Sequence, residues 1–344
     1  MRAITIQPGQ PVPDPETSSV VITEDVAVGG QRIRKGHRLS GDDVPMLADL
    51  NRPVHAVVLE PGDVHEDDAG ARLASAVAGP GLTIRGPSFS RYNLVANTKG
   101  LLRVDAAALL RLNRLPGVAI FTLEDRIPVV PGKIVTGVKV TPVAVADATL
   151  LEAEAIAAEE PVVQVMPFRP LQVGVISTEG PDWRVRDRFQ ASVEQKIGWY
   201  GGSVIGFSDL PRDAGVIASE IERLEGEGVD LVLAAGGNTI DPLDPTLRAL
   251  DVAGAEIVRF GAPAHPGSMF WLAYRGTLPI FNLASCSMFS KATIADVVLP
   301  WIMTGERVES DTLAGLGFGG LLDRGMSFRF PPYDVEGVEE TGEE

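Results

Sequence analysis

The regular alternation of apolar runs and helical patterns after residue 170 is the feature that most constrains the fold. Five apolar runs are typical of buried strands: residues 172–176, 203–207, 229–235, 255–260 and 278–283. Helical periodicity lies between them, as in Phe189, Val193 and Ile197, which follow one another at steps of four. Strands that are apolar on both faces and alternate with amphipathic helices predict an α/β fold with a doubly wound parallel sheet.

The first 165 residues have a more mixed texture, and the length of 344 residues predicts about two domains. Short apolar runs separated by glycines indicate a small β-rich module at the start of a mixed, β-rich N-terminal domain. The expected division is a β-rich module over residues 1–60, a mixed α/β domain over 61–165, a second α/β domain over 166–306, and an acidic tail, disordered at its end, over 307–344. A strand is predicted at residues 54–59, and helices at residues 66–78, 105–112, 148–160, 187–199 and 287–303, the last with Ser287 as its N-cap.

Composition limits the partners of the chain. With 30 Lys and Arg against 46 Asp and Glu, the net charge is −16, which opposes binding to nucleic acid and to anionic lipid surfaces. An anionic small ligand would have to be held by backbone N–H groups and a few local cations. One cysteine excludes an internal disulfide and a cysteine-based zinc site. The start has no signal-like apolar stretch and no run reaches about 18 apolar residues, so we expect a cytoplasmic protein.

Four polar loops that follow the predicted strands form the expected binding site. Ligands of open parallel sheets bind beyond the carboxyl ends of the strands, where helix N-termini present free N–H groups. Small hydroxyl residues and glycines in these loops suit an oxyanion or phosphate cradle, although ordinary turns use the same residues. The candidate binding residues are Ser177, Thr178, Gly236, Gly237, Asn238, Thr239, His265, Gly267, Ser268, Ser285, Cys286 and Ser287.

Two aspartates, Asp241 and Asp244, lie three residues apart after the glycine pair. This spacing places both carboxylates on one side of a turn, where they would be catalytic residues that bind Mg²⁺ beside a phosphate. Compensation of the dipole at a helix N-terminus, with Pro242 and Pro245 in the first turn, explains the same residues equally well. A second acidic group, His65 with the three acids that follow it, is better explained by a helical first turn than by a metal site.

The loop sequences resemble a known family. VDLVLAAGGNTIDPLDPT is similar to the strand, glycine pair and acidic turn of the molybdopterin-binding fold of molybdopterin molybdotransferases and the gephyrin E domain. GVISTEG resembles the first strand and loop of that family, HPGS its Pro-Gly loop, and LPIFNLASCS the strand before its Pro-Gly-Asn-Pro turn. The resemblance covers residues 170–306, with a weaker likeness at residues 61–69 and 93–102.

This resemblance implies a molybdopterin-binding type of sheet whose ligand is molybdopterin, a pterin with a dithiolene and a terminal phosphate. Residues 236–239 would take the phosphate, and Asp244 matches the acidic residue of the family. It also implies Mg²⁺-assisted molybdate insertion into the adenylylated cofactor, and a homodimer in which Arg91 or Lys99 of the second copy completes the site. Two positions differ from the family: residues 284–287 are Ala-Ser-Cys-Ser, and Asp241 replaces a glycine.

Three functions are compatible with these features. The first is a molybdotransferase-like enzyme of molybdenum cofactor biosynthesis. The second is a non-catalytic carrier that holds the cofactor for a partner such as a molybdoenzyme. The third is a nucleotide pyrophosphatase-like hydrolase on the same fold. A P-loop is absent from the sequence, which excludes ordinary P-loop ATP hydrolysis.

Overall fold

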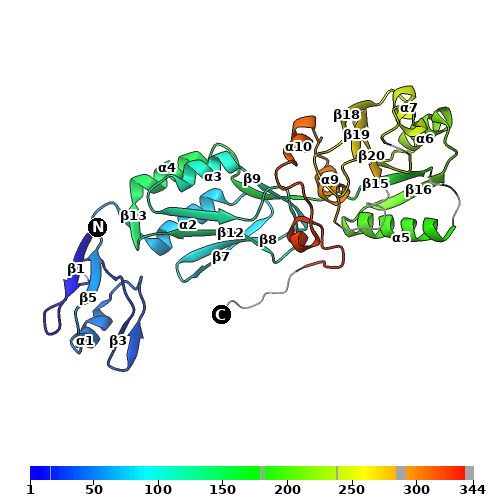
Figure 1. Cartoon of the computed structure of the whole chain (residues 1–344). Coiled ribbons are helices and arrows are strands. Elements are labelled where there is room, and N and C mark those ends of the chain that lie inside the picture. Colours follow the sequence, from blue (N-terminus) through cyan, green and yellow to red (C-terminus); the bar gives the residue numbers. More distant parts are fainter. Residues whose placement is uncertain (16, 179, 181–182, 238, 284–291, 338–344) are drawn as a thin grey trace. The chain divides into compact units, whose positions relative to one another are not determined.

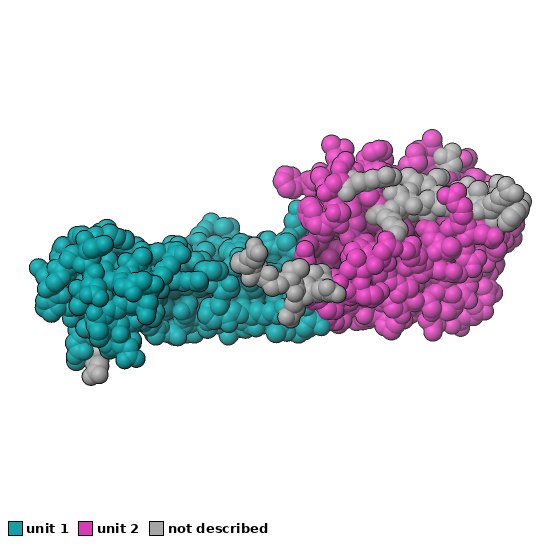
Figure 2. Space-filling model, turned by 90° about the horizontal axis from the view of Figure 1, so that it is seen from below, with its two compact units in different colours: residues 1–97, 103–125, 134–164 teal, residues 98–102, 126–133, 165–344 magenta. Residues whose placement is uncertain are grey.

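A computed structural model gives the structure of the chain and describes all residues except 16, 179, 181–182, 238, 284–291 and 338–344. The chain forms two compact units, which are coloured separately in Figure 2. Unit 1 consists of residues 1–97, 103–125 and 134–164, and unit 2 of residues 98–102, 126–133 and 165–344. Among the described residues, no helix combines the length and the apolar character that crossing a bilayer requires.

Unit 1 begins with a small β structure (Figure 1). Its antiparallel sheet has the order β1 (Arg2–Ile6), β5 (Val54–Val58), β2 (Val20–Ile22), and β3 (Val26–Val28) forms a hairpin with β4 (Gln31–Ile33). The short helices η1 (Gly41–Asp43) and α1 (Val44–Leu47) follow this hairpin. All five strands contribute apolar side chains to one core. The strand expected at residues 54–59 is confirmed as β5.

The rest of unit 1 contains an antiparallel sheet and three helices. The sheet has the order β10 (Val118–Thr122), β12 (Ile134–Val140), β8 (Arg91–Ala96), β7 (Leu82–Ser88), and β6 (Asp63–His65) pairs with β13 (Ala144–Ala146). The helices are α2 (Glu66–Val77), α3 (Ala106–Asn113) and α4 (Asp147–Ala157), at the positions expected from the sequence. Helix α2 packs against β8 and β12 and buries Leu73 and Val77 completely. A further sheet, most of whose residues belong to unit 2, has the order β11 (Pro128–Val129), β9 (Gly100–Val104), β14 (Val163–Pro167).

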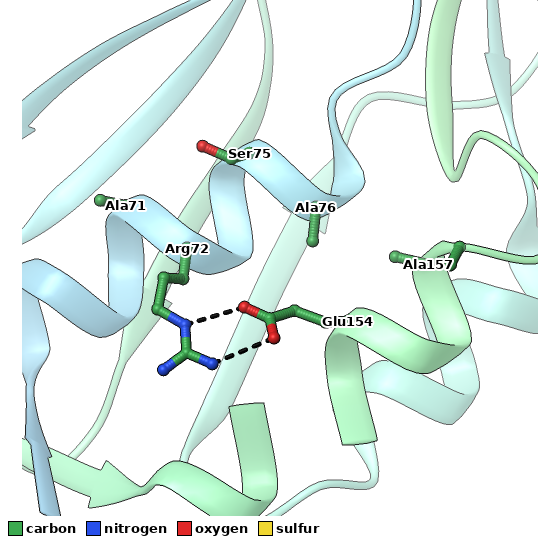
Figure 3. A pocket seen from close by; sticks show the side chains of 7 residues that line it. Ala71, Arg72, Ser75, Ala76, Glu154 and Ala157 are labelled. Atoms are coloured by element: carbon green, nitrogen blue, oxygen red, sulfur yellow. Dashed lines mark hydrogen bonds and ion pairs between the residues drawn. The ribbon is translucent and has the colours of Figure 1, made fainter. Parts of the chain in front are cut away.

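A bidentate ion pair joins α2 to α4 across a shallow hollow with alanine walls (Figure 3). Arg72 Nε and Nη2 lie 2.8 and 3.0 Å from the two carboxylate oxygens of Glu154, and Nη1 lies 2.6 Å from Asp147 Oδ1. These bonds raise the pKa of the Arg72 guanidinium and lower that of the Glu154 carboxyl. The charged groups in this hollow therefore bond to one another and hold the two helices together.

The main element of unit 2 is a six-stranded sheet in the order β16-β15-β17-β20-β19-β18. Its strands are β15 (Gln172–Ser177), β16 (Ser203–Asp209), β17 (Leu231–Ala235), β18 (Glu256–Phe260), β19 (Trp271–Arg275) and β20 (Leu278–Leu283). The pairs β15–β16, β15–β17 and β17–β20 are parallel, as expected.

The expectation of an entirely parallel sheet is wrong at β19, which is antiparallel to both β18 and β20. Arg275, the last residue of β19, pairs with Leu278, the first residue of β20, so the turn between the two strands consists of Gly276 and Thr277. A two-residue turn joins antiparallel strands alone, since a parallel crossover needs a dozen or more residues. Gly276 has a φ of +59°, which such a tight turn favours.

Helices cover both faces of this sheet (Figure 1). Apolar residues of α5 (Trp183–Trp199) and α9 (Ile294–Met303) pack with Val173 and Val175 of β15 on one face. Residues of α6 (Ala214–Gly226) and α7 (Pro245–Val252) pack with Ile176 and Val232 on the other. Successive strand residues point to opposite faces, so strands covered on both sides must be apolar throughout.

Helix α9 begins later than expected. Ser287 lies outside the described residues, but Ala292 and Thr293 are not helical, so a continuous helix over residues 287–303 is wrong. The helix begins at Ile294, and Thr293 is its N-cap in a capping box with Asp296. A threonine followed three residues later by an acidic residue is a signal for a helix N-terminus, and it indicates the start of this helix better than Ser287 does.

Residues 308–333, expected to belong to a tail, instead extend the core of unit 2. Helix α10 (Ser310–Gly315) and the 3-10 segment η2 (Arg324–Arg329) form here. Val308, Leu313 and Phe330 are buried in the core that α5 and α9 share. The acidic residues 338–344 lie outside the described residues.

The centre of this core holds a charged pair. Asp296 of α9 is 0% exposed, and its Oδ1 lies 2.7 Å from the ammonium of Lys196 on α5. The same oxygen accepts a hydrogen bond from Tyr333 Oη at 2.9 Å, while Oδ2 accepts from the Thr293 backbone N–H and hydroxyl. Burial raises the pKa of Tyr333, which keeps its hydroxyl protonated as a donor.

The first prediction concerns this pair. We expect Asp296→Asn to lower the free energy of unfolding by about 3–5 kcal/mol, because it leaves the Lys196 ammonium buried without its counter-charge. Chemical denaturation measures the change. Asp209→Asn, which breaks the half-exposed pair with Arg186, is the matched control and should have a much smaller effect. Equal losses in both variants would contradict the prediction.

Candidate functional site

The register of unit 2 brings the predicted loops to one edge of the sheet. Ser177 pairs with Ala235, and Ala235 pairs with Leu283, so β15, β17 and β20 end side by side. Phe260, the last residue of β18, pairs with Trp271 at the start of β19. The loops that follow β15, β17, β18 and β20 therefore leave the sheet at its carboxyl edge, where sequence reasoning expected a ligand.

The structure describes eight of the twelve candidate binding residues. Asn238, Ser285, Cys286 and Ser287 lie outside the described residues. The described candidates are Ser177, Thr178, Gly236, Gly237, Thr239, His265, Gly267 and Ser268.

The two glycines after β17 have a backbone conformation, with positive φ, that other residues rarely adopt. Gly236 and Gly237 have φ values of +95° and +88°. A Cβ at Gly237 would lie 3.0 Å from both Asp244 Oδ1 and Thr246 Oγ1, which is tighter than ordinary packing. The first turn of α7 therefore lies directly against the loop, and glycine at this position leaves room for that close approach.

The loop after β15 contains a buried hydroxyl without a bonding partner. Thr178 is 6% exposed, and its backbone N–H donates to Ala235 O at 2.9 Å. Its Oγ1 has no hydrogen-bond partner within the part of the chain that the structure describes. An unpaired buried hydroxyl costs about 1–3 kcal/mol, so a ligand that bonds to it would recover part of this cost.

The contacts of Asp244 are those of a helix cap. Asp244 is 1% exposed and is the N-cap of α7, with Oδ1 accepting from the Thr246 N–H at 2.9 Å. Its other oxygen lies 2.5 Å from Arg212 Nη2. Asp241 is exposed, and its Oδ1 accepts from the Leu243 N–H at 2.9 Å.

These contacts do not fit the Mg²⁺ site that the sequence allowed. Both oxygens of Asp244 are bonded to groups that a cation would have to displace, and one of these groups is itself a guanidinium. No cluster of three potential metal ligands occurs among the described residues. The geometry favours the helix-capping interpretation for Asp244, whereas Asp241 accepts from a backbone N–H before the helix begins.

The loop after β18 is held through its backbone. The His265 N–H donates to Gly320 O, and the Leu322 N–H donates to His265 O, both at 2.7 Å. Gly267 has a φ of +111°, and a Cβ there would clash with Ile294 at the start of α9. The side chains of His265 and Ser268 are exposed and reach solvent at the sheet edge.

Sequence reasoning did not single out Asn282, which connects two of these loops. This buried residue of β20 accepts from the Trp271 N–H at 2.7 Å and donates to Met269 O at 3.0 Å. Its amide nitrogen also lies 3.5 Å from Thr239 Oγ1 in the glycine loop. The sequence did contain a signal for this role, since an asparagine within the apolar run PIFNL is expected to be buried. A buried amide needs hydrogen-bond partners, and these hold neighbouring loops in place.

Lys99 and His65, two further residues that the sequence singled out, both bond to neighbouring parts of the protein. The Lys99 ammonium donates to Trp199 O at 2.9 Å and pairs with Glu336. His65 is the N-cap of α2: its Nδ1 accepts from the Asp67 N–H, and its Nε2 donates to Gly36 O at 2.9 Å. The first-turn interpretation of His65 and its acids therefore agrees with the structure.

Comparisons with known proteins give remote likenesses only. No protein-family model matches the chain, and no curated protein matches it. A Corynebacterium diphtheriae protein assigned to molybdenum cofactor biosynthesis aligns at 15% identity over 42% of this chain and 97% of its own, with a TM-score of 0.27. The molybdopterin biosynthesis MoeA protein from Pyrococcus horikosii aligns at 14% identity over 70% of this chain and 79% of its own, with a TM-score of 0.31. These values establish neither a shared family nor a shared function.

The second prediction tests the role of Asp244. We expect Asp244→Ala to lower the free energy of unfolding by about 0.5–2 kcal/mol through loss of the N-cap. Asp241→Ala, the exposed neighbour, should have a smaller effect. Thermal unfolding with and without millimolar Mg²⁺ distinguishes the interpretations. A Mg²⁺-dependent rise in the melting temperature that disappears in both variants would contradict the capping role.

Proposed function

We propose that unit 2 binds an anionic, phosphate-bearing ligand at the carboxyl edge of its sheet, and that this ligand is molybdopterin. The chain would then act in molybdenum cofactor biosynthesis. The observation that carries the proposal is the buried Thr178 hydroxyl, which has no hydrogen-bond partner among the described residues and lies beside the strand that leads into the glycine pair. The sequence resemblance supplies the identity of the ligand.

The loop residues would hold the phosphate mainly through neutral donors. Gly236 and Gly237 allow an anion to approach the backbone, and the Thr178 hydroxyl adds a donor without a long side chain. Asn282 would keep the glycine loop in position through Thr239. This arrangement suits a chain with a net charge of −16, because strong cationic attraction is unavailable over most of its surface.

Within this proposal we favour carriage of the cofactor over catalysis. The observation behind this choice is the engagement of both Asp244 oxygens by the α7 cap and by Arg212. Mg²⁺-dependent molybdate insertion by a molybdotransferase-like enzyme is the second candidate, with Asp241 as the residue still able to take a cation. Release of AMP from adenylylated molybdopterin only in the presence of Mg²⁺ and molybdate would establish insertion, whereas its release from simple dinucleotides would establish hydrolysis.

The third prediction tests ligand binding. We expect Thr178→Val to weaken the binding of molybdopterin about tenfold to a hundredfold, because a hydrogen bond to a charged group contributes about 1.5–3 kcal/mol. The melting temperature should stay the same or rise, because the variant removes an unpaired buried hydroxyl. Calorimetry measures the affinity, and fluorescence of the oxidised pterin identifies ligand retained by the purified protein.

Thr136→Val is the matched control for this variant. Thr136 of β12 is 2% exposed, and its hydroxyl also has no partner among the described residues, but it lies in unit 1. It should retain full affinity with a similar change in melting temperature. Equal affinity in wild type and in Thr178→Val would contradict the proposed site.

The fourth prediction concerns assembly. The resemblance implies a homodimer, and we propose that the chain forms one in solution. Sedimentation at micromolar concentration should then give a species of twice the mass of one chain. A monomer that binds molybdopterin with full affinity would contradict this part of the proposal and leave the site itself intact.

A further inference from the structure

Unit 1 contains a cavity of about 670 Å³ that the molybdopterin proposal does not use. Four separate segments line it: the hairpin of β3 and β4, the start of α2, the turn between β7 and β8, and the connection from β12 to β13. The charged residues of its lining are Asp25, Arg32, Arg34, Lys35, Glu66 and Lys139. A volume of about 300–1,000 Å³ is usual for small-molecule sites.

The charge of this cavity is opposite to that of the whole chain. Its lining contains four cationic and two acidic side chains, whereas the chain carries a net charge of −16. One of the acids, Asp25, already accepts from the Arg32 guanidinium at 2.5 Å and from the Lys35 N–H at 3.0 Å. The remaining positive charge borders a half-open cavity, and most of it lies on exposed side chains that can reach an anion from solvent.

Two of the cations contact Phe89, one at its ring and one at its backbone carbonyl. Phe89 is 68% exposed; the Arg34 guanidinium carbon lies 5.2 Å from the centre of its ring, and Lys139 Nζ donates to its carbonyl at 3.1 Å. Phe89 and Ser90 have φ values of +48° and +60°, a conformation that costs energy in residues other than glycine. An aromatic side chain on the turn therefore lies next to two cations that come from other segments, Arg34 after β4 and Lys139 of β12.

A buried carboxyl group forms another wall of the cavity. Glu66, the first residue of α2, is 7% exposed and accepts a hydrogen bond from the Ser90 hydroxyl. Burial raises the pKa of Glu66, and the bond from Ser90 and the charge of Lys139 only partly offset this. A Cβ at Gly36 would clash with the Glu66 carboxyl, so glycine at this position lets the hairpin close against it.

We propose that this cavity binds a small organic phosphate with a flat ring, of the nucleoside phosphate class. Arg34 and Lys139 bind the phosphate, and the exposed face of Phe89 contacts the ring. Glu66 bonds to a hydroxyl or amino group of the same ligand. Cations, an aromatic face and a carboxyl group around one cavity match the three parts of such a molecule, whereas inorganic phosphate uses only the first.

The fifth prediction tests this site on the full chain with AMP as the probe. Calorimetry at about 0.15 M salt should show AMP binding that Arg34→Gln and Lys139→Gln each weaken at least tenfold. Phe89→Leu should weaken AMP binding without changing the affinity for inorganic phosphate. The matched control is Arg111→Gln, which removes one charge from an exposed ion pair with Glu159 elsewhere in unit 1 and should bind AMP like the wild type.

Three results would overturn this inference. The first is no AMP binding at about 1 mM, and the second is equal AMP affinity in Arg34→Gln, Lys139→Gln and Arg111→Gln. The last is AMP binding that is lost in Thr178→Val but kept in Arg34→Gln. That result would assign the nucleotide to unit 2. Because the two variants lie in different units, failure of this site and failure of the molybdopterin proposal are distinguishable.

Discussion

The buried carboxylate of Asp296 is the interaction that holds the helices and the C-terminal segment of unit 2 together. It joins α5 through Lys196, the C-terminal segment through Tyr333, and the start of α9 through Thr293. The first N–H of α9 then donates to Pro266 O in the loop after β18, so the network reaches the carboxyl edge of the sheet. A buried charge is tolerated only when its hydrogen bonds are complete, and the four donors supply them.

The buried polar groups at the carboxyl edge differ in whether their hydrogen bonds are complete. Asn282 uses both ends of its amide to hold two loops, and Asp244 uses both oxygens to hold α7 and Arg212. Thr178 is also buried, yet its hydroxyl has no partner among the described residues. Satisfied groups keep the loops rigid, and an unsatisfied group between them favours a ligand that completes its bonding.

The sequence by itself determined the elements whose signals are local. Apolar runs located the parallel strands of unit 2, and period-four spacing located α5, because burial on both faces or on one face imposes those patterns on neighbouring residues. Small hydroxyl and glycine residues marked the loops that the register brings to one edge. The helical first turn after His65 was also visible, since its three acids suit the helix dipole.

Only the tertiary structure decided the features that join distant residues. Tyr333 is buried because the C-terminal segment reaches the core of unit 2, and Lys196 pairs with Asp296 although the two residues are 100 positions apart. The cavity of unit 1 likewise collects side chains from four segments whose separate patterns indicate nothing about a ligand. The periodicity of a sequence indicates whether a side chain is buried, but the topology of the fold determines which other side chains it contacts. A buried charge stabilises the fold only if those contacts include an opposite charge and complete its hydrogen bonds.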